Sequence, residues 1–309
     1  MQIKDLLKTH KEFVVMLIIV IAFFAIVFIR QDAKVSINIT DNQIIEKKVA
    51  DYQPILDSIE AKSFYVYDIL NDKSLFSKDE HLKLPLASIT KLMSGLVVLD
   101  VMPDTAIITI NNDDIEMEGD SGLVIGEKWK LKDLLDFSLI SSSNDGMHAI
   151  ASLLDNYEIM NGENTVKMMN EKAKKLGLDD TVFINETGLD VNDNMSGAYS
   201  SAYDISLLLK DILKNNPGLI SSTNQQTENF VSESNVKHTA TNTNESINDI
   251  PNMISSKTGF TNLAGGNLAI MFDAGVMHPI IIVILGSTVD GRFTDIVKLA
   301  KISLEKLSE

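Results

Sequence analysis

The sequence predicts an α/β (α+β) fold, in which β-strands near both ends of the globular part enclose a mainly helical middle. Residues 63–70 and 74–76 are strand-like, and a turn with Asn71 and Asp72 separates them, which indicates a β-hairpin. Residues 131–139 and 147–154 carry apolar side chains at the spacing of two buried helices.

The end of the chain supplies the rest of the predicted fold. Residues 267–272 and 279–286 predict two strands joined by a turn, and the second is so apolar that both of its faces must be covered. One helical stripe can cover it, formed by Phe293, Ile296, Val297, Ala300, Leu304 and Leu307. Since no repeat or second globular domain is evident, residues 51–309 are expected to form one domain.

An apolar segment precedes this domain. Residues 13–29 contain no charge and reach the lower limit of length for a transmembrane helix. Lysines are denser before this segment than after it, which places residues 1–12 in the cytoplasm and the globular domain outside. A cleaved signal peptide is the alternative, but the apolar run is long for one and no small-residue cleavage motif follows. We therefore expect an uncleaved anchor at residues 13–29 and a polar tether at residues 30–50.

The composition narrows the possible chemistry. The chain has no cysteine, so covalent catalysis must use another nucleophile, and its five histidines lack the spacing of metal ligands. We expect neither a metal nor another cofactor. The net charge of −16 argues against nucleic acid as a partner.

Three short motifs, in one order along the chain, carry the functional prediction: Ser88-Ile-Thr-Lys91, Ser142-Ser-Asn144 and Lys257-Thr-Gly259. An apolar run follows Lys91, which is typical of the first turn of a buried helix. Residues three apart on a helix share one face, about 5 to 6 Å apart at Cβ, so the Lys91 amine can reach the Ser88 hydroxyl. A serine and a lysine in contact can act as nucleophile and base.

Two other Ser-x-x-Lys matches lie in different surroundings. Ser234 is in a polar, turn-rich stretch at residues 221–248, and Ser303 is in the amphipathic C-terminal helix. Both serines are expected at the surface, without a chemical role.

With their surroundings, the motifs resemble those of the serine DD-peptidases of the penicillin-binding protein superfamily, most closely the low-molecular-mass D-alanyl-D-alanine carboxypeptidases. The likeness covers most of residues 60–290 and includes Asn185-Glu-Thr-Gly-Leu-Asp190 and Ser200-Ser-Ala-Tyr-Asp204. It implies a DD-peptidase/β-lactamase-like fold, which is an antiparallel sheet flanked by helices with an inserted helical subdomain. Residues 51–309 are then the catalytic domain.

The resemblance also implies a mechanism. Ser88 attacks the carbonyl of a terminal D-Ala-D-Ala bond, and water cleaves the resulting acyl-serine. Lys91 acts as the base, provided that burial and a second cation, Lys257, lower its pKa. Ser142 relays a proton to the departing amine, and Asn144 holds Lys91 and the substrate backbone.

The strand of the third motif is expected, by the same resemblance, to bind substrate. Thr258 hydrogen-bonds the terminal carboxylate, and Gly259 lets the substrate backbone approach. The backbone N–H groups of Phe260 and Ser88 form the oxyanion hole.

Three ionisable residues outside the motifs are given structural roles. Relatives often carry an arginine on the strand beside the Lys-Thr-Gly strand. The only arginines of this chain are Arg30 and Arg292, and His278 lies nearest that region, so carboxylate recognition is expected to be weaker or differently arranged. His278 is interpreted as a turn residue and His148 as a packed residue of an apolar helix. Glu186 lacks the sequence surroundings of a β-lactamase's deacylating glutamate and is interpreted as a surface loop residue.

The leading hypothesis is a serine-type D-Ala-D-Ala carboxypeptidase anchored in the bacterial cytoplasmic membrane, with its catalytic domain on the outer side. Its expected partners are peptidoglycan stem peptides ending in D-Ala-D-Ala, β-lactams as acylating inhibitors, and the membrane. The first alternative is a DD-endopeptidase or transpeptidase acting on cross-linked peptidoglycan. The second is an inactive wall-binding protein of the same fold, which would bind peptidoglycan without being acylated.

Overall fold

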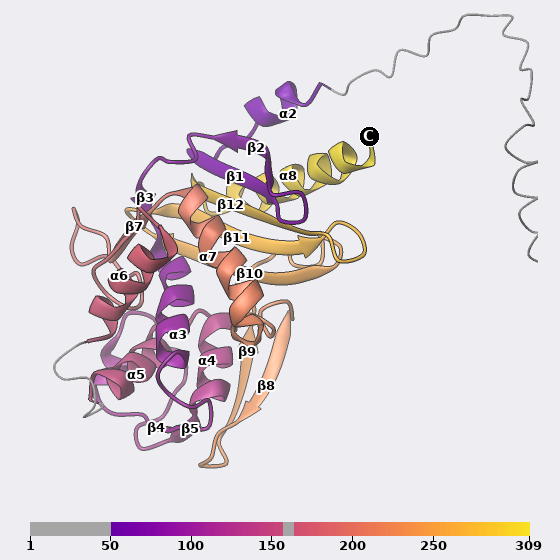
Figure 1. Cartoon of the computed structure of the whole chain (residues 1–309). Helices are drawn as coiled ribbons and strands as arrows, with labels where there is room; N and C mark the ends of the chain where they lie inside the picture. Colours follow the sequence, from indigo (N-terminus) through magenta and orange to yellow (C-terminus); the bar gives the residue numbers. More distant parts are fainter. Residues whose placement is uncertain (1–50, 157–163) are drawn as a thin grey trace, which may run out of the picture. The chain divides into compact units, whose positions relative to one another are not determined.

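The computed structural model describes residues 51–156 and 164–309, and its centre is an antiparallel sheet of five strands (Figure 1). The strands lie in the order β10, β11, β12, β1, β2. Their bounds are Ser63–Asp68 (β1), Lys73–Lys78 (β2), Met253–Thr261 (β10), Gly265–Asp273 (β11) and Pro279–Ser287 (β12). The first and last strands of the described chain therefore meet in one sheet, as the α/β (α+β) prediction requires.

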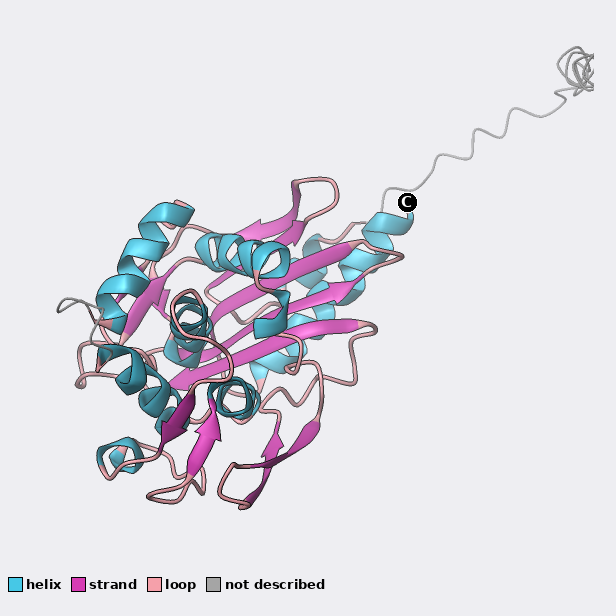
Figure 2. Ribbon diagram, turned by 60° about the horizontal axis from the view of Figure 1, so that its bottom comes forward, coloured by secondary structure: helices cyan, strands magenta, loops and turns pink. Residues whose placement is uncertain are grey.

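Both faces of this sheet are covered by helices (Figure 2). From Ile280 to Leu285 on β12, alternate side chains enter two different buried clusters, because successive side chains of a strand point to opposite faces. Helix α7 (Ala202–Asn215) packs on one face, while α8 (Gly291–Ser308) and the short α2 (Gln53–Asp57) pack on the other. The prediction that the apolar strand at 279–286 is covered on both faces is confirmed.

A mainly helical region is inserted between β2 and β10. Its helices, besides α7, are α3 (Lys91–Leu99), α4 (Leu131–Ile140), α5 (Asn144–Asp155) and α6 (Thr165–Leu176). Short strands pair around them, namely β3 (Leu84–Pro85), β4 (Ile107–Thr109), β5 (Lys128–Lys130), β6 (Val182–Phe183), β7 (Ala198–Ser200), β8 (Thr227–Val231) and β9 (Lys237–Thr241). The described residues of the region also form the 3₁₀ turns η1 (Ala87–Thr90), η2 (Asp113–Glu116) and η4 (Pro217–Leu219). One buried cluster runs from the sheet into this region, so the inserted helices share the core of the sheet.

The two additional Ser-x-x-Lys matches have different outcomes. Ser234 is exposed in the turn between β8 and β9, as predicted. The prediction for Ser303 was wrong, because Ser303 is fully buried in α8 and its hydroxyl donates to the Leu299 carbonyl at 2.7 Å. A hydroxyl bonded to the preceding helical turn can be buried without a polar partner outside the helix.

The predicted N-terminal segments lie outside the described residues. These are the tail at 1–12, the anchor at 13–29 and the tether at 30–50, and they stay predictions. In the ranges 51–156 and 164–309, no helix is both long enough and apolar enough to cross a bilayer.

Candidate active site

Ser88 lies in the tight turn η1, directly ahead of α3. Its neighbour Ala87 has a φ of +50°, a left-handed conformation that is uncommon for a residue with a Cβ atom. Such conformations persist only where the surrounding structure enforces them, and they gather at functional sites. Lys91 begins α3 and is fully buried, and its Nζ donates to Ser88 Oγ at 2.7 Å. The predicted nucleophile and base are therefore in contact.

Two further acceptors hold the Lys91 amine. Asn144 Oδ1 accepts from Nζ at 2.6 Å, and the Thr187 backbone carbonyl accepts at 3.0 Å. Burial lowers the pKa of Lys91 well below its ordinary value, and the positive charge of Lys257 lowers it further. The neutral amine, which can accept a proton, is consequently available far below the pH at which an exposed lysine would form it.

Lys257 lies on β10 and reaches the loop between α4 and α5. Its Nζ donates to Ser142 Oγ at 2.8 Å and to the Thr258 carbonyl at 3.0 Å. Burial, followed by the positive charge of Arg292, lowers the pKa of Lys257 to about 7. The second and third motifs therefore meet through this lysine and serine.

The loop between α4 and α5 divides its tasks among three adjacent residues. Ser143 is the N-cap of α5, and its Oγ accepts from the Gly146 N–H at 2.9 Å. Ser142 has a φ of +62° and faces Lys257, whereas Asn144 faces Lys91. Ser143 therefore caps the helix, while Ser142 accepts a hydrogen bond from Lys257 and Asn144 accepts one from Lys91.

Strand β10 is an edge strand of the sheet, and it brings Thr258, Gly259 and Phe260 beside the Ser88 turn. A Cβ atom on Gly259 would lie 2.6 Å from the Leu86 carbonyl oxygen and 3.3 Å from the Ser88 nitrogen. Glycine is thus required here for the strand to pack on the turn, a reason in addition to the predicted approach of substrate. Thr258 is buried, whereas the Phe260 side chain is 49% exposed.

Arg292 is the site residue that the sequence reasoning missed. It lies in the first turn of α8, is largely buried, and donates from Nη1 to the Gly259 carbonyl at 2.9 Å. The expectation that His278 would lie nearest this region was wrong, since His278 sits at the opposite end of the β11–β12 pair and bonds Asp68 at 2.8 Å. The connection from β12 to α8 could have indicated the position of Arg292. Strand β12 ends near the Gly259 end of the sheet, so the helix that follows it begins beside the third motif.

Glu186 differs from its predicted role as a surface loop residue. Its side chain is only 14% exposed, and its Oε1 lies 2.6 Å from Nδ1 of His148 on α5. His148 is therefore a packed residue with a charged partner, which the apolar pattern of its helix did not indicate.

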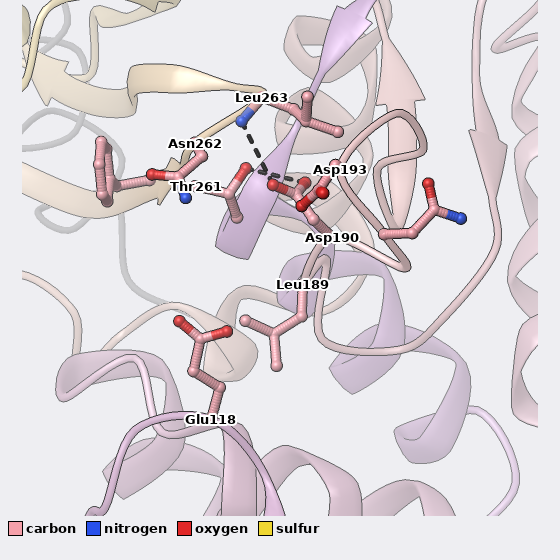
Figure 3. A pocket seen from close by; sticks show the side chains of 9 residues that line it. Glu118, Leu189, Asp190, Asp193, Thr261, Asn262 and Leu263 are labelled. Atoms are coloured by element: carbon pink, nitrogen blue, oxygen red, sulfur yellow. Dashed lines mark hydrogen bonds between the residues drawn. The ribbon is translucent and has the colours of Figure 1, made fainter.

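A polar hollow of about 310 Å³ opens beside Phe260. Figure 3 shows Asp190 at its wall, where the carboxylate accepts from Thr261 Oγ1 at 2.9 Å and from the Leu263 N–H at 3.2 Å. Glu118 faces the hollow from the helical region (Figure 3). Its backbone carbonyl accepts from Nδ2 of Asn144. The hollow is therefore lined by Phe260, which follows the third motif, and by Glu118, which contacts Asn144 of the second motif.

The sequence comparisons agree with this geometry. A model of the D-alanyl-D-alanine carboxypeptidases, peptidase family S11, matches residues 47–288. The chain belongs to this family. Among its relatives are D-alanyl-D-alanine carboxypeptidase DacF of Bacillus subtilis (32% identical over 247 residues, 78% of this chain and 61% of DacF) and the D-alanyl-D-alanine endopeptidase of Pseudomonas aeruginosa (35% identical over 219 residues, 69% of this chain and 67% of the relative). The predicted family is confirmed, and the chain spans 61% of the length of DacF.

Solved structures show the same fold for this family member. A mutant of the Streptomyces K15 DD-transpeptidase aligns with a TM-score of 0.72 at 21% identity, covering 80% of this chain and 98% of that one. The D-alanyl-D-alanine carboxypeptidase from Mycobacterium tuberculosis aligns with a TM-score of 0.70 at 24% identity, covering 80% and 91%. The predicted DD-peptidase/β-lactamase-like fold is confirmed.

Replacing Gly259 by alanine is expected to destabilise the protein by about 1 to 3 kcal/mol, because the new methyl group must displace the Leu86 carbonyl. Chemical denaturation measures this loss. Gly218→Ala is the matched control, since a Cβ there meets no atom within 4 Å, and its stability should stay within about 0.5 to 1 kcal/mol of the parent. Equal stability of the two variants would contradict the packing argument.

Proposed function

We propose that this chain is a serine-type D-Ala-D-Ala carboxypeptidase that removes the terminal D-alanine of peptidoglycan stem peptides through an acyl-serine. The observation that carries the proposal is the contact between Ser88 Oγ and a fully buried lysine amine whose pKa is strongly lowered. A lysine in this state can take the proton of a serine hydroxyl, whereas an exposed lysine cannot do so near neutral pH. Family membership supports the choice of substrate.

In the acylation step, Lys91 Nζ takes the proton of Ser88 Oγ while Oγ attacks the carbonyl carbon of the D-Ala-D-Ala bond. The carbonyl oxygen becomes an oxyanion, to which the backbone N–H groups of Ser88 and Phe260 would donate. Such donors contribute about 2.7 to 4 kcal/mol each to transition-state stabilisation. The close packing of Gly259 on the Ser88 turn supports this pairing of amides from two segments.

Departure of D-alanine requires a proton on its nitrogen. Lys91 carries the proton taken from Ser88 and passes it through Ser142 Oγ, which Lys257 holds at 2.8 Å, to this nitrogen as the C–N bond breaks, and Asn144 keeps the Lys91 amine in place at 2.6 Å. Water then attacks the acyl carbonyl while Lys91 takes its proton, and Lys91 returns that proton to Ser88 Oγ as the acyl–oxygen bond breaks. Apart from water, each step uses groups of the chain itself.

The positive charges around β10 provide the binding site for the terminal carboxylate. Thr258 Oγ1 offers a hydroxyl, and Lys257 and Arg292 place two cations beside the strand that carries it. Opposite charges in a site with little water attract strongly. Arg292 therefore supplies the positive charge that relatives often supply from an arginine on the neighbouring strand.

A DD-endopeptidase or transpeptidase is the second candidate, favoured by one specific observation. Relatives from Pseudomonas aeruginosa and Escherichia coli that are 35% and 34% identical to this chain are named D-alanyl-D-alanine endopeptidases. The acyl-serine chemistry is shared, and only the leaving or accepting amine differs. Product analysis on cross-linked and uncross-linked muropeptides separates the two functions.

The proposed place of action is the outer side of the bacterial cytoplasmic membrane. The apolar residues 13–29 and the lysines before them support an anchor with this orientation. Assembled peptidoglycan lies on that side.

Ser88→Ala should abolish covalent labelling by a fluorescent penicillin, because the acylated oxygen is removed. The full chain and the variant are incubated with the label and compared on a denaturing gel, and release of D-alanine from a stem-peptide mimic is measured in parallel. Ser234→Ala, in an exposed turn, is the control and should label like the parent. A labelled Ser88→Ala protein would contradict the proposal, and a folded parent without label would favour the inactive wall-binding protein.

Arg292→Gln should lower kcat/KM by about tenfold or more for peptides with a free terminal carboxylate, because a charge-assisted contact worth about 1.5 to 3 kcal/mol is lost. Steady-state kinetics on a D-Ala-D-Ala peptide measure the effect. Lys301→Gln on the same helix removes an exposed positive charge and should leave kcat/KM unchanged. Equal kinetics for Arg292→Gln and the parent would remove Arg292 from the binding site.

A further inference from the structure

His148 and Glu186 form an ion pair beside the proposed base. The Nδ1 atom of His148 lies 2.6 Å from Glu186 Oε1, and the two side chains are 30% and 14% exposed. His148 is one helical turn after Asn144 on α5, so both residues share the face that is turned toward Lys91. The motifs assign no role to either member of the pair.

The pair connects the two segments that hold the Lys91 amine. Helix α5 supplies Asn144 Oδ1, and the segment that follows β6 supplies the Thr187 carbonyl, at 2.6 and 3.0 Å from Nζ. Glu186 directly precedes Thr187, and its own carbonyl accepts from Ser94 Oγ at 2.6 Å. A bond from α5 to Glu186 therefore fixes the distance between the two acceptors on which the position of Lys91 depends.

The pair also determines the net charge beside Lys91. The hydrogen bond to Glu186 raises the pKa of His148, and the charges of Glu186, Asp114 and Asp155 act in the same direction against desolvation. Desolvation alone would raise the pKa of Glu186, but the bond and charge of His148, together with Lys91, hold it below its ordinary value. Glu186 in turn acts to raise the pKa of Lys91.

We propose that His148 and Glu186 are positioning residues for Lys91, which hold its two acceptors together and keep the local charge neutral so that the amine can serve as base. This inference rests on the proposed role of Lys91. It assigns to Glu186 a function through its pairing with His148, without contact to the substrate.

Loss of either charge of the pair has a predictable effect on the pKa of Lys91. With His148 uncharged, the Glu186 carboxylate is uncompensated and stabilises the protonated form of Lys91, so a higher pH is needed to form the base. With Glu186 uncharged, His148 loses the hydrogen bond that raises its pKa and gives up its proton more readily, so the site stays close to neutral and the base forms near the parent pH. Removing both charges also leaves the site neutral and should cancel the upward shift.

The test is the acylation rate of the full chain by a fluorescent penicillin between pH 5 and 10, for the parent, His148→Gln, Glu186→Gln and the double variant. Glutamine keeps a hydrogen-bonding group at each position. The midpoint of the rising limb should move up by about 0.5 pH unit or more in His148→Gln and stay close to the parent value in Glu186→Gln. In the double variant it should return to the parent value, so the comparison of His148→Gln with the double variant carries the test even if Glu186→Gln folds poorly.

A second buried pair of a histidine and a glutamate provides a matched control. In this pair, His238 Nε2 lies 2.7 Å from Glu127 Oε1, and the His238 ring packs on Trp129 and Phe137. His238→Gln should lower Tm and leave the midpoint unchanged. An unchanged midpoint in His148→Gln, or an upward shift that persists in the double variant, would overturn the proposal and leave the pair a structural contact. A parent that is not acylated at Ser88 would instead overturn the proposed function.

Discussion

Two lysine side chains buried in one site are the constraint on which the rest of this structure depends. Lys91 and Lys257 are almost completely buried, and two such charges repel each other. Burial of an unpaired ammonium group is costly, so a lysine in this position loses its proton at an unusually low pH. The energetic penalty of burying the lysines is therefore what makes one of them a base.

The fold meets this constraint with hydrogen bonds from segments that are far apart in the sequence. The Lys91 amine is held by the Ser88 hydroxyl, by an amide on α5 and by a carbonyl after β6. Lys257 comes from the edge strand β10 and is held by Ser142. Gly259 allows that strand to pack directly on the Ser88 turn, so the two halves of the site come from the sheet and from the inserted helical region.

The sequence was sufficient for the motif residues because each carries its own chemistry and a local context. The apolar run after Lys91 and the loop before α5 placed these residues correctly. Arg292 and the Glu186 to His148 pair were missed because they reach the site through tertiary contacts, for which a single sequence contains no periodic signal. The β8–β9 hairpin was missed for a related reason, since its alternation is mostly of polar side chains.

The pKa of Lys91 itself tests the central claim most directly. Carbon-13 labelling of the lysine ε positions, with Lys91→Met to assign the signal, allows the Lys91 resonance to be followed by NMR as the pH is raised. The account predicts a midpoint well below the value of about 10.4 of an exposed lysine. A midpoint near that value would show that the buried amine is protonated at neutral pH and would contradict its role as base.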